Sequence, residues 1–597
     1  MNPVINASEP IWAVGSAFLT ALLIALTGRW QNLRDLWGPL GALAQFGIVA
    51  SLVPAVLSGE TRTFTLTTPM PGVALYFKVD ELGLFFALMA SFLWFIASLY
   101  SVGYMRALKE HAQTRFFAFY AISLGSAVGI AFAGNLFTLF VFYEMLTLAT
   151  YPLVVHKQDA EARAKARVYM TYLLGTSIGF QFTAILVIYG ISGELNFTKG
   201  GFLQGQAPDW LLLSAFLLYI AGIGKSAIMP FHKWLPSAMV APAPVSALLH
   251  AVAVVKAGVF TVLRVVVYVF GVDCLVSLQV AQILPYVAGT TIVVASLIAL
   301  FQDDLKLRLA YSTISQLSYV VLGAGLLSPL GAMGATLHMV FHGFAKITLF
   351  FTAGHIYCAT KKTKISQMRG IGKQMPFTMI GFTIGALGMI GLPPASSLWS
   401  KWYIGLGALE TQHYFALGVL VVSTILNALY FLPIVYSAFF EGGGGVEALT
   451  LPSPPSPNTV GEGESQLLPS PDAAGEGSVN LTPPAPLSAS REGGEALYSP
   501  SPFTERGQGG EVNPETPSPT LPLSAGGESQ LLPSSEASGE GQGVRATEKP
   551  PTSEVIEFST PYLTLMTLAI CATALGVLVL FVYPHPFLEL ARRVAGL

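Results

Sequence analysis

The sequence predicts an all-α integral membrane protein of about fourteen transmembrane helices, arranged as two inverted five-helix repeats that each contain one broken helix. Three observations predict this fold: the composition, the number of apolar runs, and prolines at corresponding places in two of the runs. Of the 597 residues, 53% are hydrophobic and only 11% are charged, whereas a soluble protein carries about 25% charged residues. This composition excludes a soluble enzyme, a disordered protein and a nucleic-acid-binding protein.

Fourteen runs of the chain are long and apolar enough to cross a membrane. A helix needs about 20 apolar residues to span the hydrocarbon core, and we expect one helix for each run. The runs lie at 11–27, 36–57, 81–104, 116–134, 136–155, 169–191, 210–229, 242–270, 281–301, 311–327, 330–357, 376–392, 413–440 and 561–583.

The distribution of lysine and arginine predicts how these helices are oriented. Basic residues gather in the loops after odd-numbered runs, as at 157–167 and 361–373, whereas the loops after the second, fourth, sixth, eighth and tenth runs contain only Arg62, Lys78 and Lys199. Short cytoplasmic loops are enriched in Lys and Arg. We therefore expect a multi-pass protein of the plasma or inner membrane, with its amino terminus outside.

Two of the runs are interrupted by proline. Pro230 lies in the seventh run, and Pro393 and Pro394 follow each other in the twelfth. Proline removes a backbone hydrogen bond and breaks the helix, which leaves free backbone groups at membrane depth. Because broken helices at corresponding positions of two halves are typical of inverted-repeat transporters, we expect one repeat at 116–270 and a second at 281–440.

Residues 441–555 differ from the rest of the chain. They hold 16 of the 33 acidic residues, only 4 of the 31 basic residues and 18 of the 39 prolines. Such a segment cannot bury enough apolar surface to fold, so we expect a disordered cytoplasmic insert. It serves either as an interaction tether or as a repetitive insertion, which is tolerated because a long surface loop costs little to close. Three helices at 1–115 and a final helix with its tail at 556–597 complete the predicted organisation.

Two charged residues in neighbouring parts of the predicted bundle lie too deep in their runs to reach the membrane surface. Glu144 is nine residues into the fifth run, and Lys225 is fifteen residues into the seventh. A charge at this depth costs at least about 2.5 kcal/mol. We expect the two to be partners, and a movable proton can switch such a pair between charged and neutral states. The alternative is a static ion pair that holds two helices together.

Lys256 lies in the middle of the eighth run, six residues after His250. A buried lysine loses affinity for its proton and approaches the range of physiological exchange, and histidine titrates there by default. We expect both to take part in proton transfer. For His250, a hydrogen-bonded core histidine is an equal alternative.

The eleventh run carries His338, His342 and Lys346 at a spacing of four residues. This spacing places all three on one helix face, where they can form a path for protons along about 12 Å of helix. The alternative is a polar stripe that faces a partner helix. Lys401 follows the proline break of the twelfth run, either at membrane depth on the broken helix or at the membrane surface.

Several ordered motifs resemble the antiporter-like proton-channel subunits, which are the large membrane subunits of complex I and of Mrp-type Na⁺/H⁺ antiporters. The motif GKSAIMPFHKWLP at 224–236 and APAPVSALLH at 241–250 resemble that family's central block. The segments at 304–316 and 338–346 resemble its blocks at spans 10 and 11. The resemblance covers roughly residues 100–440.

The resemblance implies fourteen helices, two inverted five-helix repeats and proton translocation without a bound redox cofactor. The family's glutamate of span 5 and its lysines of spans 7 and 8 match Glu144, Lys225 and Lys256. Its charged residue of span 12 matches Lys401, and lysine there disfavours the complex I subunit type that has glutamate. The segment GLPPASSLWSK at 391–401 is most similar to the D-type antiporter subunits or their membrane-hydrogenase relatives.

We therefore predict a D-like proton-translocating subunit of a multisubunit cation/proton antiporter, with other membrane subunits, protons, Na⁺ and lipid as partners, and no nucleic acid. The alternatives are a membrane subunit of a complex I-type NADH:quinone oxidoreductase or of a membrane-bound hydrogenase, a stand-alone solute symporter, and a structural scaffold. The three cysteines are far apart and form no metal or Fe–S motif, so we expect no cofactor and no redox step in this chain. Whether it belongs to an enzyme complex stays open.

We expect protons to enter by the Glu144–Lys225 pair and to pass by way of His250 and Lys256. They would then follow the face that carries His338, His342 and Lys346, and leave by Lys401.

Overall fold

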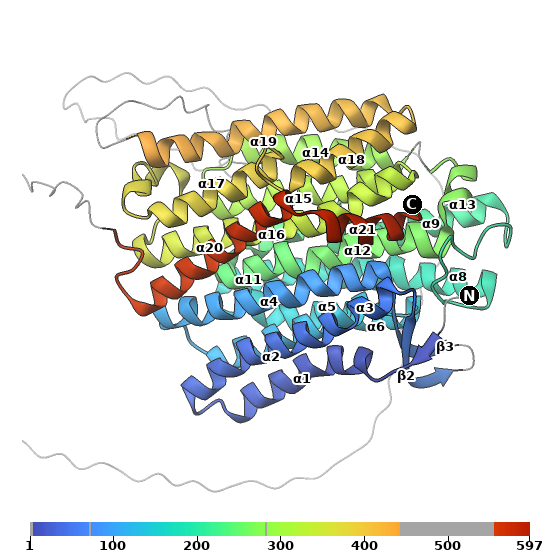
Figure 1. The fold of residues 1–597 in the computed structure, drawn as a ribbon, viewed down its shortest axis with the longest axis horizontal. Coiled ribbons are helices and arrows are strands. Elements are labelled where there is room, and N and C mark those ends of the chain that lie inside the picture. The colour runs from blue at the N-terminus through green and yellow to red at the C-terminus, as the bar shows by residue number, and fades with distance from the viewer. Residues whose placement is uncertain (1–3, 71–72, 281–282, 442–554) are drawn as a thin grey trace, which may run out of the picture. The chain divides into compact units, whose positions relative to one another are not determined.

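The computed structural model describes residues 4–70, 73–280, 283–441 and 555–597. In this part of the chain, long helices pack side by side, with helices from both ends of the sequence in contact (Figure 1). The predicted insert lies outside the described residues, apart from its first residue, Glu441, and its last, Val555.

The first five predicted runs each coincide with a helix. Asp80 and Asn135 begin two of them as N-caps, since their side chains accept hydrogen bonds from the backbone nitrogens of Gly83 and Thr138 at 2.8 and 2.7 Å. The helices are α1 (Glu9–Leu26), α2 (Gln31–Ser51) with the short α3 (Val53–Leu57), α4 (Glu81–Ala107), α5 (Gln113–Ala131) and α6 (Leu136–Val154).

The next three runs form less regular helices. The sixth run is part of a continuous helical segment over Ala160–Ser192, and the eighth is part of one over Ala243–Phe270 in which every residue is buried. Turns of π-helix interrupt both segments. The elements of this part of the chain are α7 (Ala160–Thr176), η1 (Ser177–Phe182), α8 (Thr183–Ser192), α9 (Asp209–Gly222), η2 (Gly224–Ser226), α10 (Trp234–Ser237), η3 (Ala238–Val240), α11 (Ala243–Ala247), η4 (Leu248–Val252), α12 (Val254–Val265), η5 (Val266–Phe270) and α13 (Val272–Ser277).

The remaining runs also coincide with helices. The eleventh run is one unbroken helix of 32 residues, α16, which packs against α15, α17, α18 and α20. The elements are α14 (Leu284–Leu300), α15 (Leu305–Gly325), α16 (Pro329–Thr360), η7 (Ile365–Gln367), η8 (Ile371–Lys373), α17 (Pro376–Ile390), α18 (Ser397–Glu410), α19 (Tyr414–Phe440), α20 (Pro561–Val582) and α21 (His585–Ala595).

Both predicted helix breaks are present. The first separates α9 from α10 and contains Pro230, and the second separates α17 from α18 and contains Pro393 and Pro394. The peptide bonds before Pro230 and before Pro394 are cis. The first break begins earlier than expected, because α9 ends at Gly222 and Lys225 lies within the break.

A small β-sheet adds to the helices that the sequence predicts. Strand β1 (Val4–Asn6) pairs in parallel with β2 (Thr61–Met70), which pairs antiparallel with β3 (Val73–Val79). The segment TRTFTLTTPM of β2 alternates threonine with larger residues, a pattern that favours a strand. A search for apolar runs of about 20 residues does not detect this strand, because it is short and more than half of its residues are polar.

Nine helical segments of the described residues are long and apolar enough to cross a membrane, and α9, α14 and α17 are shorter apolar helices. The helices α15 and α16, which carry lysine, arginine or histidine among apolar residues, belong to neither group. The chain is therefore a mostly helical, multi-pass membrane protein, and the count of fourteen spans and the limits of the two repeats stay predictions.

Candidate functional site

The eight predicted residues lie on six elements of the bundle, where six of them are buried and Glu144 and Lys401 are half-buried. Lys225, His250, Lys256, His338 and Lys346 have 0% exposed surface. They project from α6 (Glu144), η2 (Lys225), η4 (His250), α12 (Lys256), α16 (His338, His342 and Lys346) and α18 (Lys401).

Lys225 is bound by α6, the helix that carries Glu144. Its Nζ donates hydrogen bonds to the backbone oxygen of Tyr143 at 2.9 Å and to Oγ1 of Thr147 at 2.5 Å. It also lies over the Tyr143 ring, 3.2 Å from the centroid. The lysine is thus held by a carbonyl, a hydroxyl and an aromatic face.

The expected ion pair between Glu144 and Lys225 is not formed. No ion pair joins the two residues, and both Glu144 carboxylate oxygens are buried without a hydrogen-bond partner among the described residues. The two residues are neighbours on adjoining elements. Lys225 already finds acceptors on α6, so the carboxylate stays free to bind a proton or a water molecule.

A close approach of backbones brings the first break next to α12. A Cβ atom at Gly258 would lie 2.3 Å from the backbone nitrogen of Ser226 and 2.4 Å from the carbonyl carbon of Lys225. Only glycine fits at this distance. Because Gly258 lies two residues after Lys256, this contact sets how near the second lysine comes to the first.

Lys256 and His342 are in direct contact across two helices. The Nζ of Lys256 lies 2.6 Å from Nδ1 of His342. When the ammonium donates this hydrogen bond, Nδ1 is the acceptor and the ring proton resides on Nε2. Nε2 of His342 has no partner in the described part of the chain. A proton can therefore pass between the two groups without a large rearrangement.

His250 and Lys346 meet through adjacent residues of α15. Nδ1 of His250 lies 3.1 Å from Oγ1 of Thr313, and Nζ of Lys346 donates to Oγ of Ser312 at 2.7 Å and to the backbone oxygen of Leu309 at 3.2 Å. Sequence analysis did not identify these two hydroxyls, because serine and threonine are common inside apolar helices. Lys346 lies one turn after His342 on α16, so the pair lies beside the Lys256–His342 contact.

His338, which precedes His342 and Lys346 on α16, lies next to the second helix break. The rings of His338 and His342 are nearly parallel, with centroids 5.9 Å apart. Nδ1 of His338 lies 2.9 Å from Oγ of Ser400 on α18, and the ring stacks on Tyr319 of α15 at 5.2 Å. The predicted spacing of four residues therefore does produce one connected face.

Lys401 binds the free end of the helix before it. Its Nζ donates to the backbone oxygens of Met389 and Ile390 at 3.2 and 2.8 Å, and lies 4.9 Å from the centre of the Tyr319 ring. These carbonyls are among the last of α17 and lack partners within their own helix. Lys401 is thus half-buried on α18, directly after the second break, and its depth in the membrane stays a prediction.

Arg264 and Glu557 are among the buried charged groups that the sequence analysis did not identify. Arg264 of α12 forms a buried ion pair with Asp80, the N-cap of α4. Glu557, which follows the insert, accepts hydrogen bonds from the backbone nitrogens of Phe377 and Thr378 at 3.1 and 2.7 Å at the start of α17. Arg264 could have been found as a charge within the eighth run. Glu557 could not, because it looks like part of the acidic insert.

Comparison with known proteins places these residues in a family. The family model described as "NADH:quinone oxidoreductase/Mrp antiporter, TM" matches residues 133–427, and that described as "NADH-Ubiquinone oxidoreductase (complex I), chain 5 N-terminus" matches residues 71–117. The first match contains all eight predicted residues.

This chain is similar to several known proteins, which differ in how much of their own length it covers. NADH-quinone oxidoreductase subunit N of Desulforudis audaxviator is 32% identical over 74% of this chain and 87% of that protein. A probable K⁺/H⁺ antiporter subunit of Rhizobium meliloti is 31% identical over 67% of this chain, which spans 40% of that longer protein. Other relatives, chloroplast NAD(P)H-quinone oxidoreductase subunits 5, are covered over about half of their length, for example 51% in Adiantum capillus-veneris.

Two solved structures have a similar fold. The Mrp complex from Dietzia contains a chain that superposes with a TM-score of 0.71 at 19% identity, over 99% of this chain and 96% of that one. The archaeal membrane-bound sulfane sulfur reductase contains one with a TM-score of 0.66 at 24% identity, over 74% and 90%. Both are multisubunit membrane complexes.

Proposed function

This chain belongs to the family of membrane subunits shared by NADH:quinone oxidoreductases and Mrp antiporters, and we propose that it is the D-like, proton-translocating subunit of a multisubunit cation/proton antiporter. Protons, and Na⁺ as the exchanged cation, are its substrates. It works in the plasma or inner membrane together with other membrane subunits and lipid, and its amino terminus lies outside.

One observation carries the proposal: buried lysines and histidines lie in contact inside the bundle, and the lysines form no ion pair within the described residues. Lys256 and His342 are in direct contact at 2.6 Å, and in the described residues no carboxylate lies within ion-pair distance of Lys225, Lys256, Lys346 or Lys401. An unpaired buried ammonium costs several kcal/mol. A lysine that gives up its proton avoids this cost, which favours proton exchange over a structural role.

The contacts suggest an order for the transfer that differs from the linear path expected from the sequence. Protons enter at Glu144 and Lys225, reach the Lys256–His342 contact, and continue by His338 to Lys401. His250 and Lys346 form a side branch on α15. Nε2 of the three histidines is buried without a partner in the described residues. Because buried polar atoms are nearly always hydrogen-bonded, water bound at these nitrogens would connect the steps.

Replacing Glu144 with Gln tests the proposal. Glutamine keeps the size of the side chain but cannot release a proton, so cation-driven proton movement in vesicles that contain the assembled complex should be lost. Glu161→Gln on α7, outside the predicted path, is the matched control and should keep transport. Unchanged transport by E144Q in a complex that assembles normally would contradict the assignment.

A second function, the membrane subunit of a complex I-type oxidoreductase or of a hydrogenase-like complex, is favoured by the 87% coverage of subunit N. Purification of the native complex separates the two. Small antiporter subunits would support the antiporter, whereas Fe–S and flavin subunits would support the oxidoreductase. Transport by the purified chain alone would instead indicate a stand-alone symporter.

A further inference from the structure

Three metal-binding side chains meet outside the proton path, where the connection after α4 approaches the end of α6. Glu110 and His111 lie between α4 and α5, and His156 lies two residues after α6. One ligand atom from each of the three lies within 4.8 Å of the others. We propose that Glu110, His111 and His156 form a binding site for a first-row transition-metal ion, Zn²⁺ above all.

The ligand set and its spacing suit this ion. Zn²⁺ prefers histidine nitrogen and carboxylate oxygen at about 2.0–2.2 Å, so the ligand atoms of a tetrahedral site lie about 3.4 Å apart. Oε2 of Glu110 is 3.7 Å from Nε2 of His156 and 3.9 Å from Nδ1 of His111. These two distances exceed the tetrahedral spacing by only about 0.3 and 0.5 Å, and the ligand atoms of His111 and His156 lie within 4.8 Å of each other.

A second observation, the unused ring of His156, points to a ligand. The side chain of His156 is 0% exposed, yet both of its ring nitrogens lack a hydrogen-bond partner in the described residues. Such groups are nearly always bonded. The ring is held in place by the edge of Phe116, at 5.6 Å between centroids, while Arg115 donates to the backbone oxygen of His156 at 3.3 Å.

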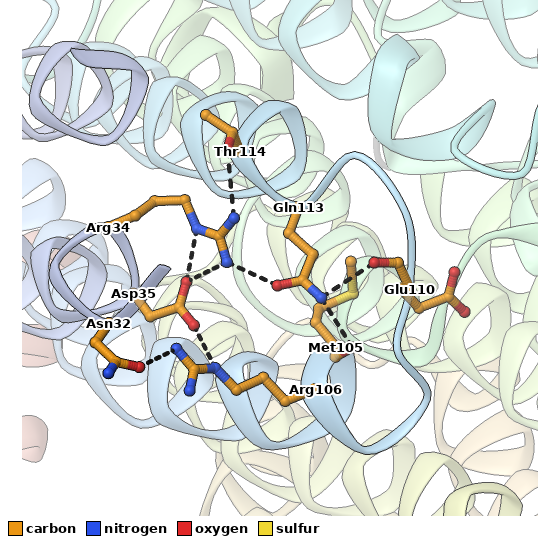
Figure 2. Close-up of polar contacts among 8 residues, drawn as sticks. All are labelled: Asn32, Arg34, Asp35, Met105, Arg106, Glu110, Gln113 and Thr114. Carbon is orange, nitrogen blue, oxygen red and sulfur yellow. Dashed lines mark hydrogen bonds and ion pairs between the residues drawn. The ribbon is translucent and has the colours of Figure 1, made fainter. Parts of the chain in front are cut away.

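Glu110 is arranged to offer its carboxylate to this ring. Its backbone oxygen accepts a hydrogen bond from Gln113 at 3.0 Å, and its side chain points away from the network of Arg34, Asp35 and Arg106 (Figure 2). Arg34 and Arg106 bind Asp35 instead. The carboxylate of Glu110 is thus not used by these arginines.

An ion can reach the cluster and leave a coordination position open. His111 is half exposed, at 51%, and Glu110 also lines a cavity of about 400 Å³ together with Lys157 and Asp159. Three protein ligands leave the fourth position of Zn²⁺ to water. A bound ion would tie the α4–α5 connection to the end of α6, the helix that carries Glu144.

Direct metal binding tests the site without any transport measurement. The purified full-length chain, stripped with a chelator, is titrated with Zn²⁺ in competition with a chromogenic chelator, and with Co²⁺ followed by visible absorption. We expect one tight site with the absorption of a tetrahedral ion. Glu110→Gln, His111→Ala and His156→Ala should each weaken binding by at least about tenfold, or 1.4 kcal/mol. His585→Ala, at an exposed histidine of α21, is the matched control and should bind like the wild type.

The exposed position of His111 keeps the test decisive even when H156A does not fold. Wild-type affinity in H111A and E110Q, or no Zn²⁺ binding by the unmodified chain, would overturn the proposal. Neither result would bear on proton translocation, because the binding assay does not depend on it.

Discussion

The two helix breaks hold their lysines in different ways. Lys225 lies within the first break and binds a neighbouring helix, α6, beside a free glutamate. Lys401 lies after the second break, on α18, and binds the last carbonyls of α17, the helix before the break. It forms no ion pair with an acid in the described residues. A helix broken by proline therefore carries a lysine in both places, but the two lysines have different hydrogen-bond partners.

This difference suggests different tasks for the two lysines. An acid near Lys225 can exchange its proton and so change the charge that the lysine experiences, which is suited to a switch at the entry. Helix carbonyls favour a positive charge next to them, so Lys401 is suited to hold the proton at the end of the path while it anchors the helix. The predictions below test this contrast, from the largest expected effect to the smallest.

Replacing Lys225 with Ala should have the largest effect. The substitution removes the proton-binding group at the first break, and we expect cation-driven proton transport to fall about 100-fold or more, the usual contribution of a proton-transferring side chain. Transport by the assembled complex in vesicles measures it. Lys233→Ala, at an exposed lysine in the same break, should transport like the wild type, and equal loss in both variants would contradict the special role of Lys225.

Replacing Lys401 separates anchoring from proton release. Lys401→Met leaves the carbonyl of Ile390 without its donor, while that of Met389 keeps a hydrogen bond from Gln316 at 3.3 Å. We therefore expect the unfolding free energy to fall by about 1–3 kcal/mol, together with transport. Lys401→Arg keeps donors near the carbonyls but stays protonated. It should retain thermal stability and still lose transport. Thermal unfolding and vesicle transport distinguish the two, and full transport by K401R would exclude proton release from this residue.

A methyl group at Gly258 should disturb the first break without removing any titratable group. Gly258→Ala would place a Cβ atom 2.3 Å from the Ser226 backbone, and overpacking of this kind costs about 1–3 kcal/mol. We expect lower thermal stability and slower transport. Gly418→Ala on α19, where nothing lies within 4 Å of the added atom, should change neither.

Removing the hydroxyl next to His250 should have the smallest effect. Thr313→Val deletes the partner of Nδ1, which is worth about 1 kcal/mol, and we expect transport to fall about fivefold because the residue lies on the side branch. Thr383→Val on α17, whose hydroxyl bonds only its own helix, serves as control. A loss as large as that of K225A would place His250 on the main path.

Much of the site could be predicted from the sequence, because each signal depends on residues that are close together along the chain. Charges inside apolar runs stand out at once, and the four-residue spacing of His338, His342 and Lys346 defines a helix face that the unbroken α16 confirms. Prolines 230, 393 and 394 mark breaks for a purely local reason, the missing backbone donor. The strands β2 and β3 were missed, since the apolar scan detects only long helices.

The sequence by itself determined the medium, the helices and the identity of the titratable groups, because hydrophobicity, helix periodicity and proline each act within a few residues of the chain. Only the tertiary structure decided which groups meet. The contact of Lys256 with His342, the binding of Lys225 to α6 without Glu144, and the support from Ser312, Thr313 and Ser400 all join separate helices. Such contacts depend on how closely the backbones of separate helices pack, as at Gly258. The distance between two helices cannot be read from the order of residues along the chain.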